Sequence, residues 1–165
     1  MMETVEQTAP ACEYTIEAAG WRDLNAVRRL EQVCFPKDAW PLWDMIGVLT
    51  LPSVVRLKAT CNGEVVGFIA GDIRRSEGTA WIATIGVLPE YRRRGIGAAL
   101  LEACETQIEL ERVRLCVRTT NEAAIHLYQR VGYNKVGEWK QYYHDGETAL
   151  VMEKWTNAAR SSGRS

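Results

Sequence analysis

The feature that most constrains this sequence is the segment 85–98, which passes from a strand-like run through a short basic loop into a helical run. Gly95 and Gly97 remove side chains where the backbone amides of the helix begin. Those amides have no acceptor within the helix and lie at the positive end of its dipole, so they favour anions. The neighbouring Arg92–Arg94 adds charge and planar donors suited to phosphate. The segment predicts a site for a pyrophosphate-bearing ligand; the alternative is an arginine-rich surface turn.

Composition and motif spacing narrow the class of ligand. The 165 residues carry 20 Lys and Arg against 21 Asp and Glu, a net charge of -1. This balance argues against the broad basic surface that nucleic-acid binding needs and against a polybasic membrane anchor. The loop lacks the Gly-x-x-x-x-Gly-Lys-Ser/Thr spacing of a P-loop and the third glycine of a dinucleotide fingerprint. The ligand is therefore expected to be a small phosphate-bearing molecule of another kind.

Cysteine usage and the ends of the chain indicate a cytoplasmic protein. The five cysteines stand at positions 12, 34, 61, 104 and 116. Their odd number and spacing fit neither a disulfide framework nor a zinc site, and only two histidines accompany them, so free thiols and no metal are expected. No signal peptide or apolar run of membrane-spanning length occurs.

Hydrophobic periodicity predicts a single mixed α/β domain over residues 13–155, between a flexible arm (1–12) and a flexible tail (156–165). Two dipeptides, Asn62-Gly63 and Asp145-Gly146, predict hairpin turns. The expected strands are 14–18, 54–61, 65–73, 79–87, 113–117, 134–143 and 147–155, and the expected helices are 21–33, 42–49, 96–108 and 124–131. Six to seven strands in one mostly antiparallel sheet, flanked by about four helices, follow from this order.

Two segments carry a resemblance to a known family. Arg92-x-x-Gly95-x-Gly97 resembles the Arg/Gln-x-x-Gly-x-Gly/Ala signature of the GCN5-related N-acetyltransferase (GNAT) family. The segment 121–133, with Asn121, Ala124, Leu127, Tyr128, Gly132 and Tyr133 at the matching positions, resembles the family's Asn-x-x-Ala-x-x-Leu-Tyr-x-x-x-Gly-Phe/Tyr signature. The resemblance covers roughly residues 13–155 and implies the GNAT fold, with a splayed central strand pair, and acetyl-coenzyme A as co-substrate without a metal.

The resemblance also implies roles for individual residues. The loop amides would hold the pyrophosphate of the coenzyme, and the preceding strand would pair with its pantetheine arm. Tyr128 would protonate the departing thiolate, although its place on an apolar helical stripe also suits a core residue. Asn121 would bind the pantetheine arm, cap the helix, or do both; Thr119 and Glu122 also have capping-box spacing. The implied coenzyme contacts are Ile85, Gly86, Val87, Arg92, Arg93, Arg94, Gly95, Ile96, Gly97, Ala98, Asn121 and Tyr128.

A third segment bears on the acceptor. The stretch 142–149 is similar to the Tyr-Tyr-x-Asp-Gly-Glu-Asp-Ala pattern of protein N-terminal acetyltransferases, including the ribosomal-protein alanine N-acetyltransferase group. The resemblance implies direct transfer of the acetyl group to a primary amine in a ternary complex, here the α-amine of a protein N-terminus. The alternative for this segment is an ordinary hairpin whose tyrosines serve packing. The implied acceptor contacts are Phe35, Trp40, Trp81, Cys116, Tyr142 and Tyr143.

The sequence departs from the family at the general base. Cys116 stands where the ribosomal-protein group has Glu, and Trp81 lies near the position where eukaryotic relatives have Tyr. An α-amine with a pKa of about 7.7–8.0 is neutral at pH 7 far more often than a lysine amine with a pKa of about 10.4. An enzyme without a strong general base is therefore expected to acetylate α-amines more easily than lysines. A small-molecule amine acetyltransferase and a non-catalytic acyl-coenzyme A sensor are the alternative functions.

Overall fold

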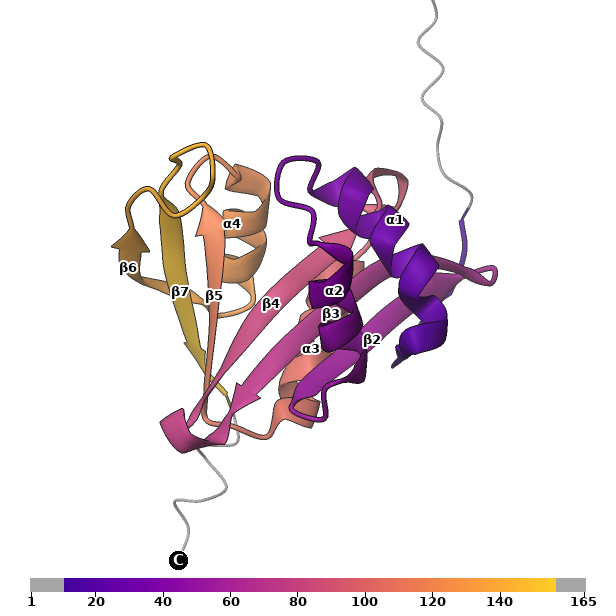
Figure 1. Ribbon diagram of the computed structural model, residues 1–165, viewed down its shortest axis with the longest axis horizontal. Coiled ribbons are helices and arrows are strands. Elements are labelled where there is room, and N and C mark those ends of the chain that lie inside the picture. Colours follow the sequence, from indigo (N-terminus) through magenta and orange to yellow (C-terminus); the bar gives the residue numbers. More distant parts are fainter. Residues whose placement is uncertain (1–10, 157–165) are drawn as a thin grey trace, which may run out of the picture.

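The computed structural model describes residues 11–156, which form one seven-stranded sheet with helices on both faces (Figure 1). The strands are β1 (Tyr14–Ala18), β2 (Val54–Cys61), β3 (Glu64–Arg74), β4 (Thr79–Val87), β5 (Arg112–Arg118), β6 (Asn134–Trp139) and β7 (Ala149–Trp155). The helices are α1 (Leu24–Cys34), α2 (Leu42–Thr50), α3 (Ile96–Ile108) and α4 (Glu122–Arg130). Short 3-10 turns cover Trp21–Asp23, Arg75–Glu77 and Pro89–Tyr91. The predicted fold class is thus confirmed.

The sheet has the order β1-β2-β3-β4-β5-β7-β6, and all neighbours are antiparallel except β4 and β5. The parallel pair is joined only over Thr79–Ile82 and Arg112–Leu115. Beyond those residues the two strands diverge toward the top of Figure 1. The expected splayed strand pair is therefore present, and it divides the sheet into two parts.

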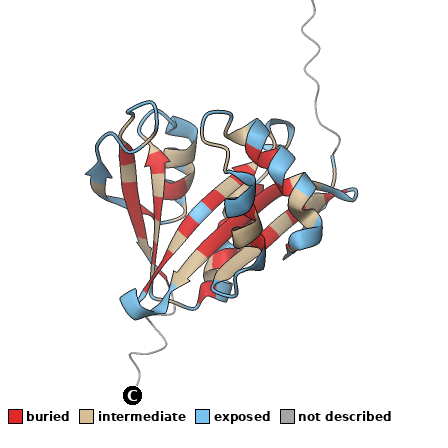
Figure 2. Cartoon of the chain, in the orientation of Figure 1, coloured by how far each residue is buried: buried red, intermediate tan, exposed pale blue. Residues whose placement is uncertain are grey.

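Each face of the sheet has its own core, and buried residues follow the sheet and the helical surfaces that cover it (Figure 2). On one face, α1 and α2 place Val27, Leu30 and Met45 against Phe68 of β3. On the other, α3 packs its apolar stripe on β2 and β3. The buried positions of that stripe are those expected from its periodicity: Ile96, Leu100, Leu101, Cys104 and Ile108.

A β-bulge at Ala83 reverses the alternation of side chains along β4. Ala70 of β3 pairs with Thr84 and Gly71 pairs with Ile82, so Ala83 has no partner in β3. As a result Ile82 and Ile85, three residues apart, both contact the core under α3 and α4, whereas Thr84 faces α1. Bulges aim side chains in this way and are frequent beside functional sites.

The predicted hairpin between the last two strands is wrong in its extent. The strands end at Trp139 and resume at Ala149, so residues 140–148 form a loop instead of a two-residue connection. Gly146 adopts a left-handed φ of 85° and donates its N–H to the Tyr143 carbonyl at 2.8 Å, so a tight turn exists, but within the loop. The loop is held by ion pairs to β5 that the hairpin signal does not encode.

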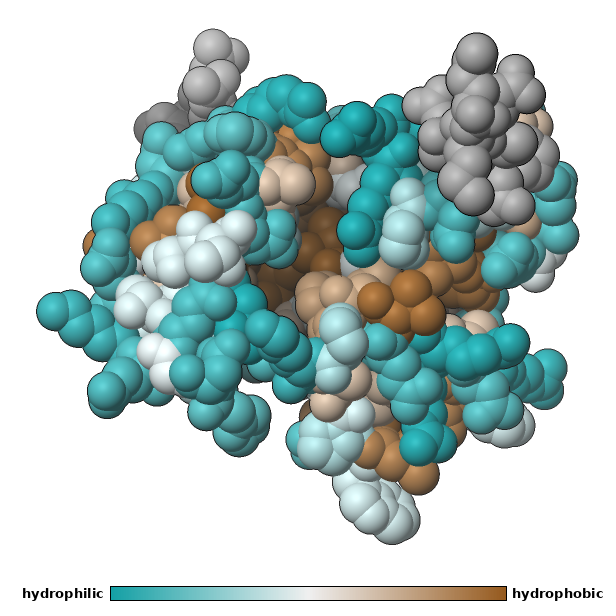
Figure 3. All heavy atoms as spheres, turned by 90° about the horizontal axis from the view of Figure 1, so that it is seen from above, coloured by the Kyte–Doolittle hydropathy of each residue, from teal (hydrophilic) through white to brown (hydrophobic). Residues whose placement is uncertain are grey.

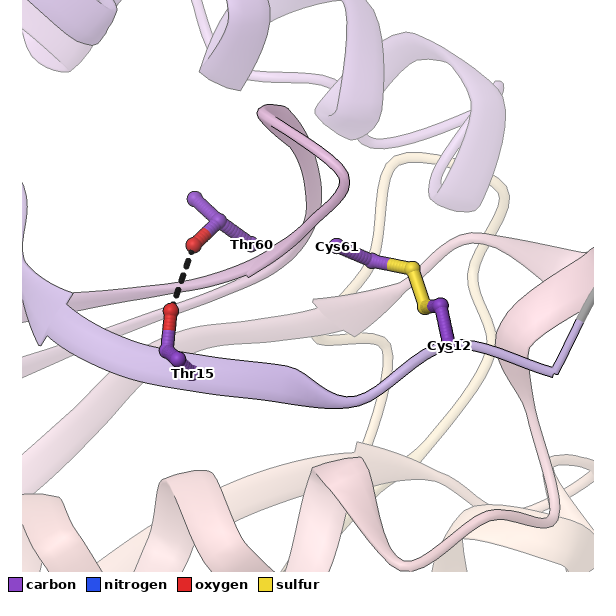
Figure 4. The surroundings of a disulfide bond; sticks show 4 residues. All are labelled: Cys12, Thr15, Thr60 and Cys61. Carbon is purple, nitrogen blue, oxygen red and sulfur yellow. Dashed lines mark hydrogen bonds between the residues drawn. A yellow bond between two sulfur atoms is a disulfide. The ribbon is translucent and has the colours of Figure 1, made fainter.

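The expectation of free thiols is also wrong. Cys12 and Cys61 form a disulfide that ties the chain before β1 to the end of β2, beside the hydrogen bond between Thr15 and Thr60 (Figure 4). Their Cα atoms lie 6.0 Å apart, within the usual range for a disulfide. The two cysteines are 49 residues apart in sequence, and only the pairing of β1 with β2 brings them together. The cytoplasmic location, which was inferred partly from free thiols, loses that support.

The structure describes little of the chain on either side of the expected domain. Most of the arm and of the tail, 1–10 and 157–165, lies outside the described residues. Thr156 is buried and donates its hydroxyl to the Leu110 carbonyl at 2.5 Å. Within residues 11–156, no helix is both long and apolar enough to span a membrane.

Candidate active site

The predicted anion loop connects β4 to α3 and has the geometry its glycines suggest. Gly95 caps α3 in the left-handed region at φ 80°, and the preceding Arg93 is also left-handed at φ 62°. The first helical hydrogen bond runs from the Ala99 N–H to the Gly95 carbonyl at 3.0 Å. The amides of residues 96–98 therefore have no acceptor within the helix and are oriented toward its N-terminal end. This loop can hold a phosphate through its backbone.

Gly97 serves a second purpose at the same helix end. A Cβ atom at this position would lie 3.1 Å from Cδ2 of Leu127 on α4, closer than a normal van der Waals contact. The glycine thus lets the N-terminus of α3 approach α4, which carries Tyr128. The two sequence signatures are joined in space by this contact.

The three arginines of the loop have different surroundings. Arg92 donates its Nε–H to the Val87 carbonyl at 2.9 Å, so its guanidinium is directed back to the end of β4. The Arg94 guanidinium lies 5.3 Å from the centroid of the Tyr91 ring, a cation–π contact. Arg93 is exposed. Arg92 and Arg93 are thus both exposed, and Arg92 is tied to the end of β4 by its hydrogen bond.

The gap between the splayed ends of β4 and β5 forms a cavity of about 150 Å³. Seen from above, the molecule has a recess with apolar walls at this end, between polar rims (Figure 3). The walls come from β4, β5, α1, α4 and the loops after α1 and β6. The lining residues are Glu31, Phe35, Asp38, Trp40, Ile82, Ala83, Thr84, Ile85, Leu115, Cys116, Val117, Arg118, Asn121, Tyr128 and Tyr143.

The structure brings most of the predicted acceptor contacts to this cavity. Phe35, Trp40, Cys116 and Tyr143 line it together with Tyr128 and Asn121. The other two predicted contacts, Trp81 and Tyr142, do not line it and belong to an adjacent row of aromatic rings in mutual contact. Successive ring centroids in that row, Trp81–Trp139–Tyr142–Tyr143, are 5.5, 5.4 and 5.0 Å apart. The row extends the cavity wall toward β6.

Tyr128 is a buried core residue that also lines the cavity. Its ring is buried, with an edge-on contact to Tyr133 at 6.0 Å between centroids. Among residues 11–156 no group hydrogen-bonds its hydroxyl, and the residue lines the cavity. Burial raises the pKa of the Tyr128 phenol well above its ordinary value, so the group stays protonated across the physiological range. A proton donor is thus held at the cavity wall.

Asn121 caps α4: its Oδ1 accepts the Ala124 N–H at 3.2 Å. The side-chain amide nitrogen stays available for a ligand, because capping uses only the oxygen. The alternative capping box from Thr119 does not form, since the Thr119 hydroxyl donates to Glu147 at 3.3 Å.

Cys116 is a wall residue and a poor nucleophile. Burial raises the pKa of its thiol to about 11, so the thiolate is scarce at neutral pH. Its strand neighbours Arg114 and Arg118 are engaged by carboxylates: Arg114 donates to Glu153 at 2.6 Å, and Arg118 to three acidic side chains. Neither arginine lowers the pKa of this thiol.

Sequence reasoning missed the role of Arg118, which joins the two loops at the cavity mouth. Its guanidinium binds Asp38, in the loop after α1, through two bonds of 2.7 and 2.8 Å. It also donates to Asp145 at 2.9 and 3.0 Å and to Glu147 at 2.9 Å, both in the loop between β6 and β7. The guanidinium lies 4.0 Å from the Tyr143 ring centroid. These contacts raise the pKa of Arg118 further, with Asp38 as the largest cause.

Sequence reasoning also missed Glu31, a buried carboxylate in the cavity wall. It stands on the apolar face of α1, four residues after Val27, where a charged residue is unexpected. That misplaced charge is the signal that could have identified it. The Thr84 hydroxyl donates to its Oε1 at 2.5 Å, and its Oε2 is buried without a hydrogen-bond partner in the structure.

Comparisons with known proteins agree with this geometry. An N-alpha-acetyltransferase of Sulfurisphaera tokodaii is 31% identical over 154 residues, covering 85% of this chain and 92% of the relative. The N-alpha-acetyltransferase RimI of Mycobacterium tuberculosis is 34% identical over 152 residues, covering 89% and 96%. The crystal structure of the ribosomal-protein-S18-alanine N-acetyltransferase from Escherichia coli superposes with a TM-score of 0.78 at 29% identity, covering 87% and 94%. Residues 24–133 match the Acetyltransferase (GNAT) family, and the chain belongs to that family.

Proposed function

We propose that this chain acetylates the α-amine of protein N-termini, with acetyl-coenzyme A as the donor. Membership of the GNAT family makes it an acetyl-coenzyme A-dependent N-acetyltransferase. The observation that carries the finer proposal is that groups expected to contact the coenzyme and groups expected to contact the acceptor line one shared cavity between β4 and β5. Coenzyme-side groups, Asn121 and Tyr128, share its wall with Asp38 and Tyr143 from the two loops joined by Arg118. The names of the relatives described above support the same acceptor class.

The residues present fit acetyl-coenzyme A. The loop before α3 offers backbone amides for the pyrophosphate, and the unpaired side of β4 beyond Ile82 is free of β5. Ile85, Gly86 and Val87 continue this side of the strand toward the loop. The coenzyme supplies the activated thioester; the protein supplies its position and the proton donor.

The chemistry is direct transfer between two substrates held in one cavity. The amine nitrogen bonds to the thioester carbonyl carbon, the carbon–sulfur bond breaks, and the sulfur takes the electron pair. Tyr128 then donates its proton to the thiolate and regains one from the acylated nitrogen. Holding both substrates together supplies a large part of the rate acceleration, because it removes the entropic cost of a bimolecular encounter. No acetylated cysteine is required, in keeping with the raised pKa of Cys116.

A panel of acceptors tests the proposal. The protein is incubated with acetyl-coenzyme A and three acceptor sets: peptides with free N-termini, N-terminally blocked lysine peptides, and small amines. Free thiol release is followed and products are located by mass spectrometry. We expect turnover on free N-termini and at most traces on blocked lysine peptides. Turnover confined to lysine peptides or small amines would overturn the acceptor assignment, and coenzyme binding without turnover on any amine would indicate a sensor.

A further inference from the structure

Acetyl transfer to an ammonium also requires a group that removes a proton from it, and none of the residues assigned a function above has that role. Cys116 and Trp81 occupy the positions where relatives of this type were expected to carry a base, and neither is basic. The raised pKa of the Cys116 thiol makes it no substitute. Another group at the cavity is needed to accept the proton.

Glu31 is the carboxylate at the cavity whose arrangement suits that function. Only 2% of the residue is exposed, yet it lines the cavity between β4 and β5. One oxygen accepts the Thr84 hydroxyl and is thereby fixed; the other is buried without a partner. A buried carboxylate oxygen without a partner costs free energy, so its retention calls for a ligand or a chemical role.

The charged and titratable neighbours of Glu31 do not neutralise it. No cation pairs with it within residues 11–156. On α1 the nearby thiol of Cys34 donates to the Val87 carbonyl at 3.4 Å. The other ionisable groups around the cavity are Asp38 from the loop after α1, Cys116 and Arg118 from β5, Tyr128 from α4 and Tyr143 from the loop after β6. Arg118 is already engaged by three carboxylates, so an incoming ammonium is the cation that this site lacks.

The β4 bulge places this carboxylate. Because Ala83 is an extra residue, Thr84 faces α1 at the level where β4 and β5 separate. Its hydroxyl therefore reaches Glu31 from the strand that borders the coenzyme-side groups. Two residues further along, a Cβ atom at Gly86 would lie 3.1 Å from Leu30 and 3.3 Å from Phe35, so the glycine lets α1 pack close to the strand.

We propose that Glu31 is the general base of this enzyme and that Thr84 is a positioning residue that holds its carboxylate at the acceptor amine. This inference rests on the proposed acetyl transfer to an α-amine. The ammonium gives one proton to Glu31, directly or across a water molecule, and the freed lone pair bonds to the carbonyl carbon. Carbon–sulfur cleavage places the electron pair on sulfur, which takes a proton from Tyr128. The second proton leaving nitrogen restores Tyr128, and Glu31 releases its proton to solvent.

Burial supports the match between base and substrate. It raises the pKa of Glu31, while the Thr84 hydroxyl opposes the rise by donating to the carboxylate. A carboxylate with a raised pKa is a better base toward an α-ammonium of pKa about 7.7–8.0 than an ordinary exposed one. A lysine ammonium at about 10.4 is a far poorer proton donor to the same group.

The test compares the pH profile of kcat/KM on an N-terminal peptide for the wild type, Glu31→Gln, Thr84→Val and the exposed control Glu64→Gln. We expect Glu31→Gln to lower the rate about 100-fold at pH 7, a typical contribution of general base catalysis. The deficit should narrow as pH rises and the amine deprotonates by itself. Thr84→Val should move the acidic limb to higher pH, because the carboxylate loses its donor. Glu64→Gln should match the wild type.

A structural role gives a different pattern. The amide of Glu31→Gln can still accept the Thr84 hydroxyl and removes a buried charge, so its thermal unfolding midpoint should equal or exceed that of the wild type. An active wild type with a lowered midpoint in Glu31→Gln and an unchanged shape of the pH profile would refute the base. An inactive wild type on every N-terminal peptide would refute the proposed function itself, and the base assignment with it.

Discussion

Replacement of Arg118 by methionine is the sharpest test of how the acceptor side is built. The substitution keeps an unbranched apolar stem and removes the guanidinium that joins the loops around Asp38 and Asp145. Asp38, Asp145 and Glu147 would then lose their shared cation, and only the exposed Lys37, 4.0 Å from Asp145, would remain beside them. We therefore expect both loops to loosen while the sheet stays intact.

The size of the effect follows from how exposed each partner is. The Arg118 side chain is 15% exposed and Asp38 is 26% exposed, so this two-bond pair is largely shielded from solvent. Glu147 is 20% exposed but keeps its hydrogen bonds from Thr119 and Thr120 when the guanidinium is removed, whereas Asp145 is 43% exposed, and pairs of that kind contribute little. A shielded charge-assisted interaction is worth about 2 kcal/mol. For a domain of this length that predicts a fall in Tm of roughly 4–8 °C.

The assay combines thermal unfolding with acceptor kinetics. Arg118→Met should raise KM for the N-terminal peptide about 10-fold, because binding must then order both loops. Coenzyme affinity should stay within about twofold, since the loop before α3 is not touched. Arg28→Met, at an exposed arginine of α1, is the matched control. An unchanged Tm together with an unchanged peptide KM would refute the argument.

The same cluster predicts a dependence on acid. Hydrogen bonds lower the pKa of Asp145, with Arg118 as the largest cause, and that of Glu147, with Thr120 as the largest cause. A lowered pKa in the folded state contributes stability above the ordinary carboxyl range near pH 4, and this contribution is lost as the pH falls below it. The difference in Tm between the wild type and Arg118→Met should therefore be largest near neutrality and shrink below about pH 4.

Three further outcomes are expected. Tyr128→Phe should lower kcat about 100-fold with coenzyme affinity nearly unchanged, measured by thiol release and calorimetry; unaltered kcat would remove it as the proton donor. Gly97→Val should destabilise by about 1–3 kcal/mol and weaken coenzyme binding, because its Cβ meets Leu127 at 3.1 Å, whereas Gly137→Ala, with open space around it, should not. Reduction of the Cys12–Cys61 disulfide should lower stability by up to about 4 kcal/mol, from the entropy of closing a loop of 49 residues; five reactive thiols in unreduced, denatured protein would contradict the disulfide.

Local backbone requirements were the features that the sequence predicted well. Asn62 and Gly63 form the expected turn with left-handed φ values of 50° and 79°. Gly95 and Gly132 likewise mark the start of α3 and the end of α4 with positive φ. Each of these depends on a few adjacent residues, so a single sequence contains the whole signal.

The contacts that build the acceptor side were not predictable in the same way. Arg118 and Asp38 are 80 residues apart, and Glu31 and Thr84 are 53 apart. Their pairing depends on sheet order and on a bulge, neither of which leaves a periodic pattern. The sequence placed Phe35, Cys116 and Tyr143 near the acceptor through family resemblance, but it could not show that Glu31 lines the same cavity.

The β-bulge at Ala83 and the separation of β4 from β5 together explain how a general base on α1 can replace one on β5. Where β4 and β5 pair, their buried side chains belong to the core under α3 and α4, and a carboxylate on β5 would have to enter the cavity from the sheet itself. Beyond Ile82 the strands separate, and the bulge directs Thr84 toward α1. The Thr84 hydroxyl thereby holds the Glu31 carboxylate of α1 at the cavity. The β5 position can then carry an uncharged side chain such as Cys116. The loss of an acidic residue from β5 is then compatible with catalysis, because the carboxylate enters the same cavity from its opposite wall.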